Sequence, residues 1–131
     1  MNNASFVYDI QRFFAKFPKL ENNKMFFYKF SSVSGRNVYG NQGAPYGITG
    51  AGHLDDAMYL FDAKSMNMTV DKNSTEYALI EQATTVFTNF AKYGNPTPDD
   101  SLGVTWPEYD NETLRYVDIG SNLTASCAPD K

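Results

Sequence analysis

A six-residue aromatic run, Met25 to Phe30, most constrains how this chain can fold. It reads Met-Phe-Phe-Tyr-Lys-Phe, which is too short and too continuously apolar for an amphipathic helix. A strand with apolar side chains on both sides must be covered on both faces, as in an α/β protein. The run therefore predicts a strand in the middle of a largely parallel sheet.

The best-defined helix is predicted further along the chain, where apolar residues recur every three or four positions. They are Leu79, Ile80, Ala83, Val86, Phe87, Phe90 and Ala91. Asn73 with Glu76 resembles a capping box at the start of this helix. Gly94 and Pro96 supply a stop at its end.

Two further elements are expected nearer the ends of the chain. Apolar residues between Phe6 and Phe17 follow a helical spacing that ends at Pro18. After a loop at 106–109, residues 114–120 predict a short strand at the edge of the sheet, followed by a polar tail. With 131 residues, the chain is a single domain or part of one.

The segment between the aromatic run and the second helix is rich in glycine from position 31 to 52 and is expected to lack regular structure. A loop of this length is uncommon in a compact domain unless it has a function. It ends at His53, the only histidine in the chain. A strand, a loop, a histidine and a helix in this order place an imidazole at the carboxyl edge of a parallel sheet, where α/β enzymes have their sites. The alternative is a surface histidine without a catalytic role.

Asp55 and Asp56 follow His53 directly and precede an apolar stretch. One interpretation is that a carboxylate orients the imidazole of His53. The favoured interpretation is stabilisation of a helix amino terminus, because a residue two positions along rarely reaches the ring.

Composition and motifs exclude several classes of function. A net charge of −4 with scattered Lys and Arg argues against nucleic-acid binding. No apolar run reaches the roughly 18 residues that span a bilayer. Residues 47–52 match no phosphate-binding loop, and His53 with Cys127 is a poor metal site, so we expect no cofactor and no metal. No G-x-S-x-G nucleophile elbow is present.

Glycosylation sequons favour a secreted parent protein. Five asparagines begin an N-x-S/T sequence: Asn3, Asn67, Asn73, Asn111 and Asn122. Residues Met1 to Ser5 do not form a signal peptide. Cys127, the single cysteine, is either a free thiol or pairs with a cysteine elsewhere in a longer protein.

The residues around His53 resemble a known family. Residues 50–61 match the histidine segment of type-B carboxylesterases and cholinesterases, roughly G-x-x-H-x-[DE]-[DE]-x-x-Y-[LV]-F. The aromatic run, the segment 87–96 and the Trp-Pro-x-Tyr at 106–109 resemble the family's flanking motifs in the same order, with Phe87 where the family often has Trp. The motifs are similar to those of secreted insect carboxylesterases, including the juvenile hormone and antennal esterases.

The resemblance implies that residues 1–131 are the C-terminal portion of a single α/β-hydrolase domain, with a helix, a core strand, a long His-bearing loop, two helices and a short terminal strand. It also implies hydrolysis of a small carboxylic ester by a Ser-His-Asp/Glu triad, in which this chain supplies only His53. Gly50, Ala51 and Gly52 would shape the approach to the site. Substrate-binding residues are not identified. Met1 is then an internal methionine or the start of a truncated gene product.

Two alternatives remain at this stage. Some cholinesterase-like proteins are adhesion or scaffold molecules that keep the fold and lack the serine, so the residue at the upstream elbow distinguishes them from enzymes. A third interpretation is an incomplete gene product with no independent role. In each case we expect the isolated chain to be inactive.

Overall fold

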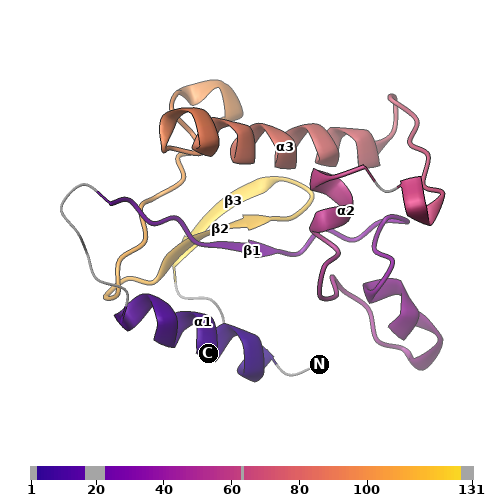
Figure 1. The fold of residues 1–131 in the computed structure, drawn as a ribbon, viewed down its shortest axis with the longest axis horizontal. Helices are drawn as coiled ribbons and strands as arrows, with labels where there is room; N and C mark the ends of the chain where they lie inside the picture. The colour runs from indigo at the N-terminus through magenta and orange to yellow at the C-terminus, as the bar shows by residue number, and fades with distance from the viewer. Residues whose placement is uncertain (1–2, 17–22, 63, 128–131) are drawn as a thin grey trace.

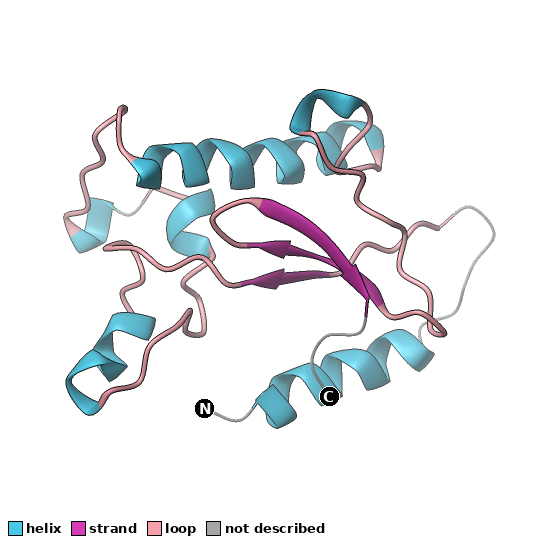
Figure 2. Ribbon diagram, turned by 180° about the vertical axis from the view of Figure 1, so that it is seen from behind, coloured by secondary structure: helices cyan, strands magenta, loops and turns pink. Residues whose placement is uncertain are grey.

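Nine elements form the chain in the computed structural model, which describes residues 3–16, 23–62 and 64–127. They are α1 (Asn3–Lys16), β1 (Tyr28–Phe30), η1 (Gly40–Tyr46), α2 (Ala57–Leu60), η2 (Lys64–Met66), α3 (Thr75–Tyr93), η3 (Asp100–Leu102), β2 (Arg115–Ile119) and β3 (Leu123–Cys127). Figure 1 shows α1 on one side of the sheet and α3 on the other. The same layers are visible from behind in Figure 2. The sheet thus has a helix over each face, as the aromatic run predicted.

The sheet has three strands in the order β1-β2-β3. β1 pairs with β2 in parallel, with Tyr28 opposite Val117 and Phe30 opposite Ile119. β2 pairs with β3 antiparallel, with Val117 opposite Ala125. Among the described residues β1 is therefore an edge strand and not the central strand that the sequence predicted. Each of its residues is only partly buried.

β2 lies in the centre of the sheet, although the sequence predicted an edge strand, because β3 covers its other side. The sequence predicts a polar tail at the residues of β3, so the presence of this strand corrects that prediction. Its partly buried residues are Leu123 and Ser126, and the other three are exposed. Such a strand is held by backbone hydrogen bonds to its neighbour rather than by an apolar face, so hydrophobic alternation does not reveal it. Cys127 ends this strand with an exposed, unpaired thiol.

Helix α3 confirms the strongest helical prediction, but its cap differs from the predicted one. The N-cap is Ser74, whose side chain accepts a hydrogen bond from the Tyr77 N–H at 3.2 Å. Asn73 lies one residue earlier, and its own N–H donates to Asp71. The helix ends at Gly94, which adopts a left-handed conformation with φ 64°.

The core forms where α3 meets the sheet. Its buried residues are Val86, Trp106, Val117 and Ile119. On the opposite face, Phe14 of α1 contacts Phe27 and Tyr109 with ring centroids 5.7 and 5.1 Å apart. Phe13 on the same helix is 60% exposed, so the apolar stripe of α1 is only partly covered. The predicted stop of this helix at Pro18 lies outside the described residues.

We expect Ile119→Ala to lower the free energy of unfolding by about 2–5 kcal/mol, because Ile119 is 1% exposed and its removal leaves a cavity. The matched control is Ile48→Ala, since Ile48 is 50% exposed and should cost less than about 0.5 kcal/mol. Urea unfolding followed by Trp106 fluorescence measures both. Equal losses in the two variants would contradict this core.

Candidate functional site

The loop that leads to His53 begins at the carboxyl end of β1 and is anchored there to β2. The N–H groups of Ser31 and Ser32 both donate to the carbonyl of Ile119 at 3.1 Å. The Ser32 hydroxyl donates to the carbonyls of Ile119 and Gly120. The loop was expected to lack regular structure, but it contains the 3₁₀ segment η1, which ends at Gly47 with φ 71°.

His53 is exposed at the end of this loop. It lines an open groove of about 350 Å³ whose walls come from α1, from β1 with the two residues before it, and from the turn around His53. The lining residues are Ile10, Phe14, Phe26, Phe27, Tyr28, Phe30, Gly52, His53, Leu54 and Asp56. Consecutive side chains of an extended segment point to opposite faces. A groove lined by Phe26 and Phe27, just before β1, and by Tyr28 of β1 therefore runs along the edge of this segment. Since β2 occupies the other edge, His53 lies beside the edge of β1 that no described strand covers.

The structure does not give Asp55 the role that the sequence favoured, which was stabilisation of a helix amino terminus. It is fully buried, and its carboxylate accepts hydrogen bonds from four donors on the loop. These are the N–H groups of Tyr39 and Gly40, both at 2.9 Å, that of Gly52 at 2.7 Å, and the side-chain amide of Asn37 at 3.3 Å. The residue therefore holds the loop together rather than stabilising the amino terminus of α2.

Asp56 follows the favoured interpretation, since it is the N-cap of α2 and accepts a hydrogen bond from the Ala57 N–H. Its other carboxylate oxygen accepts a hydrogen bond from the Tyr28 hydroxyl at 2.9 Å. Burial of the Tyr28 hydroxyl, followed by the charge of Asp56 and this hydrogen bond, raises the pKa of Tyr28 well above its usual value. The Tyr28–Asp56 contact joins β1 to the turn that carries His53.

A buried polar cluster, which the sequence did not predict, lies beneath the loop. The Tyr59 hydroxyl donates to Asn37 Oδ1 at 2.7 Å and lies 2.6 Å from the Ser34 hydroxyl. Arg36 donates from Nε and Nη2 to the carbonyl of Met58 at 2.9 and 2.6 Å. Met58 lies in the short helix α2, so Arg36 joins the loop to this helix. The Tyr at this position of the histidine segment was the only signal of the cluster in the sequence.

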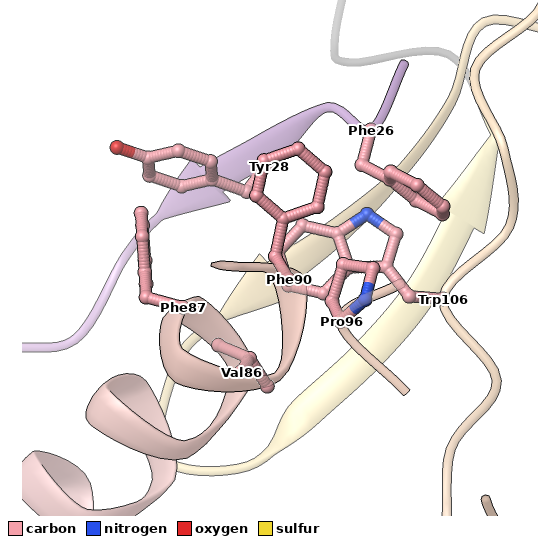
Figure 3. Close-up of a pocket in the computed structure, with 7 residues that line it drawn as sticks. All are labelled: Phe26, Tyr28, Val86, Phe87, Phe90, Pro96 and Trp106. Atoms are coloured by element: carbon pink, nitrogen blue, oxygen red, sulfur yellow. The ribbon is translucent and has the colours of Figure 1, made fainter. Parts of the chain in front are cut away.

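A second, apolar hollow of about 140 Å³ lies between β1 and α3 (Figure 3). Its lining residues are Phe26, Tyr28, Val86, Phe87, Phe90, Pro96 and Trp106. Figure 3 shows the Tyr28 hydroxyl directed away from Phe26 and Trp106. Tyr28 is the only titratable residue that lines this hollow, so its walls are almost entirely apolar.

Three serines near the loop are engaged in structural hydrogen bonds. Ser31 donates to Asp118 at 2.6 Å, Ser32 donates to the carbonyls of Ile119 and Gly120, and the Ser34 hydroxyl pairs with that of Tyr59. None is held as a nucleophile for His53. Within 3–16, 23–62 and 64–127, no three His, Cys, Asp or Glu side chains gather as a metal site. No helix in those ranges is long and apolar enough to cross a membrane.

A parallel strand followed by a long histidine-bearing loop, with helices over both faces, is part of the α/β-hydrolase fold, and solved structures of that fold match it. The family model described as the carboxylesterase family matches residues 1–129. The chain belongs to the carboxylesterase family.

Three solved esterases illustrate the likeness. Juvenile hormone esterase from Manduca sexta, with OTFP covalently attached, is 27% identical with a TM-score of 0.61, over 82% of this chain and 20% of its own. PNB esterase is 21% identical with a TM-score of 0.57 over the same shares. An esterase from Clostridium hathewayi that hydrolyses aliphatic aromatic polyesters is 16% identical with a TM-score of 0.57, over 79% of this chain and 19% of its own. No curated protein has a matching sequence. The chain thus spans about a fifth of the length of these esterases.

We expect Tyr28→Phe to lower the free energy of unfolding by about 1–3 kcal/mol at pH 7, because Asp56 loses a hydrogen-bond donor. The raised pKa of Tyr28 adds a pH dependence. An unfolded tyrosine ionises near pH 10, so the stability that Tyr28 contributes is fully present below about pH 10 and is lost as the pH rises further. Urea unfolding at pH 7 and about pH 11 should therefore show a smaller alkaline loss in the variant.

The control for this prediction is Tyr46→Phe, because Tyr46 is 83% exposed. It should leave both the stability at pH 7 and the alkaline loss unchanged. An equal alkaline loss in the wild-type chain and Tyr28→Phe would show that Tyr28 ionises as readily in the folded state as in the unfolded one.

Proposed function

We propose that this chain is the C-terminal portion of a single α/β-hydrolase domain and supplies the catalytic histidine, His53, of a carboxylic ester hydrolase. The observation that carries the proposal is the place of His53, exposed beside the uncovered edge of β1. A nucleophile from a preceding strand of the same sheet would reach the imidazole from that side. Membership of the carboxylesterase family over residues 1–129 supports the same reaction.

In the proposed reaction, the imidazole of His53 takes the proton of a serine outside this chain as that serine attacks the ester carbonyl. The tetrahedral intermediate then collapses to an acyl-enzyme as the imidazolium gives the proton to the leaving alcohol. Water repeats the two steps and releases the acid. The orienting carboxylate and the oxyanion hole would also lie outside this chain. Gly50, Ala51 and Gly52 would shape the approach to the site. The substrate would be a small carboxylic ester, and the reaction would need no cofactor.

The isolated chain should be inactive, since the serines near the loop are tied to Asp118, the end of β2 and Tyr59. We expect it to turn over p-nitrophenyl acetate no faster than its His53→Ala variant. In the natural protein with its upstream region, the same substitution should lower kcat/KM by about 10²–10⁴-fold, because general acid–base catalysis contributes that much.

Gln42→Ala is the control in both forms, because Gln42 is an exposed residue of the same loop. It should leave kcat/KM unchanged. A longer protein whose ester hydrolysis does not depend on His53 would refute the catalytic proposal. Lack of both hydrolysis and an upstream elbow serine would instead identify a non-catalytic adhesion or scaffold protein.

Secretion and N-glycosylation form a second part of the proposal. The asparagines of four sequons are exposed: Asn67, Asn73, Asn111 and Asn122. The side chain of Asn3 lies outside the described ones. Exposure is required for a glycan, which adds a large hydrophilic group at the surface.

When the chain is directed through the secretory pathway of a eukaryotic cell, we expect its electrophoretic mobility to increase after peptide-N-glycosidase treatment. Replacement of the five sequon asparagines by glutamine should abolish that change. A secreted wild-type chain with unchanged mobility after treatment would contradict the proposal.

A further inference from the structure

The buried carboxylate of Asp55 joins two parts of the loop that are separate in sequence. Tyr39 and Gly40 donate their N–H groups from the start of η1, and Gly52 donates its own from the turn before His53. With the Asn37 amide, these donors occupy both carboxylate oxygens. Oδ1 accepts from Tyr39 and Oδ2 accepts from the other three donors, so the carboxylate binds the loop through both of its oxygens. One of these donors is the N–H of Gly52, the residue directly before His53, so the carboxylate can act on His53 through the backbone.

The two parts of the loop can meet at Asp55 only because Gly40 and Gly52 are in close contact. A Cβ at Gly40 would lie 2.2 Å from the Gly50 carbonyl and 2.7 Å from the Asp55 carboxylate. A Cβ at Gly52 would lie 2.7 Å from the Gly40 nitrogen. Only glycine at both positions lets the two backbones approach one carboxylate. Gly35, in contrast, has no atom within 4 Å of such a Cβ.

His53 lies between Gly52 and Asp55, which are joined by two hydrogen bonds. Gly52 precedes it and donates to Asp55, and the Asp55 N–H donates back to the Gly52 carbonyl at 3.2 Å. Leu54 closes the turn with a left-handed φ of 69°, a conformation that a side-chain-bearing residue keeps only when its surroundings impose it. The backbone direction at His53 is thus determined from both sides.

We propose that Asp55 is a positioning residue for His53, which sets the direction of the imidazole by clamping Gly52 against Tyr39 and Gly40. The inference rests on the proposed catalytic role of His53. Its consequence is that the imidazole is already directed before a substrate binds, which reduces the ordering cost of the reaction.

The chain carries its own reporters for a test, because it has one histidine and one tryptophan. The Trp106 indole N–H donates to the Phe27 carbonyl at 3.1 Å and reports on the sheet. Two-dimensional ¹H–¹⁵N spectra of the ¹⁵N-labelled chain resolve the imidazole and indole signals separately. Asp55→Asn and Gly40→Ala should move the His53 imidazole signals toward the positions of an unfolded chain and leave the Trp106 indole signal in place.

Matched controls are Asp118→Asn, which removes a carboxylate bonded to Ser31 elsewhere on the sheet, and Gly35→Ala, which adds a methyl group in open space. Both should leave the His53 signals unchanged. Unmoved His53 signals in Asp55→Asn and Gly40→Ala would overturn the positioning role. Loss of the Trp106 signal together with those of His53 in both variants would also overturn it, because Asp55 would then support the whole fold. The proposal would also be overturned if the His53 imidazole signals of the wild-type chain already had the positions of an unfolded chain.

The two proposals fail separately. The spectra do not depend on ester hydrolysis. If His53→Ala leaves hydrolysis by the longer protein unchanged, the spectra still test the role of Asp55. Unmoved His53 signals, conversely, leave the catalytic role of His53 intact and remove only the role of Asp55.

Discussion

The parallel pairing of β1 with β2 is the contact on which the rest of the structure depends. It brings Tyr28 opposite Val117, and so joins the first third of the chain to its end. Helices α1 and α3 each bury aromatic or aliphatic side chains against the paired strands. The N–H groups of Ser31 and Ser32 extend the pairing to the carbonyl of Ile119 and thereby direct the loop toward His53.

Beyond the end of the sheet, the loop is stabilised by hydrogen bonds between polar groups rather than by apolar packing. A long loop must satisfy many backbone N–H and carbonyl groups without a neighbouring strand. Asp55, Asn37 and Arg36 supply partners from buried side chains, and Tyr59 completes the cluster. A buried carboxylate is tolerated because several hydrogen-bond donors replace its lost water. The His53 turn is therefore held by hydrogen bonds whose geometry is directional, which an apolar contact could not provide.

Much apolar surface stays open around the proposed site. The groove beside His53 follows the edge of β1 that no strand in the described part of the chain covers. Ile10 and Phe13 of α1 are exposed. Exposed strand edges and apolar patches are surfaces that proteins ordinarily cover. The solved esterases have about five times the length that this chain spans. Our proposal that the remainder of a hydrolase domain covers this side explains both facts with one arrangement.

Local patterns in the sequence determined helix α3, the existence of the aromatic strand, the short helix after His53 and the family. Helical spacing and motif order are properties of neighbouring residues, so they can be recognised without a structure. Only the tertiary structure decided that β2 is central, that β3 exists, that Ser74 rather than Asn73 caps α3, and that residues 40–46 form a 3₁₀ segment. It alone also separated Asp55 from Asp56, because adjacent carboxylates look alike in sequence. What distinguishes them is which distant donors the fold brings to each. Asp55 binds N–H groups up to 18 positions away, and Asp56 binds the Tyr28 hydroxyl 28 positions away.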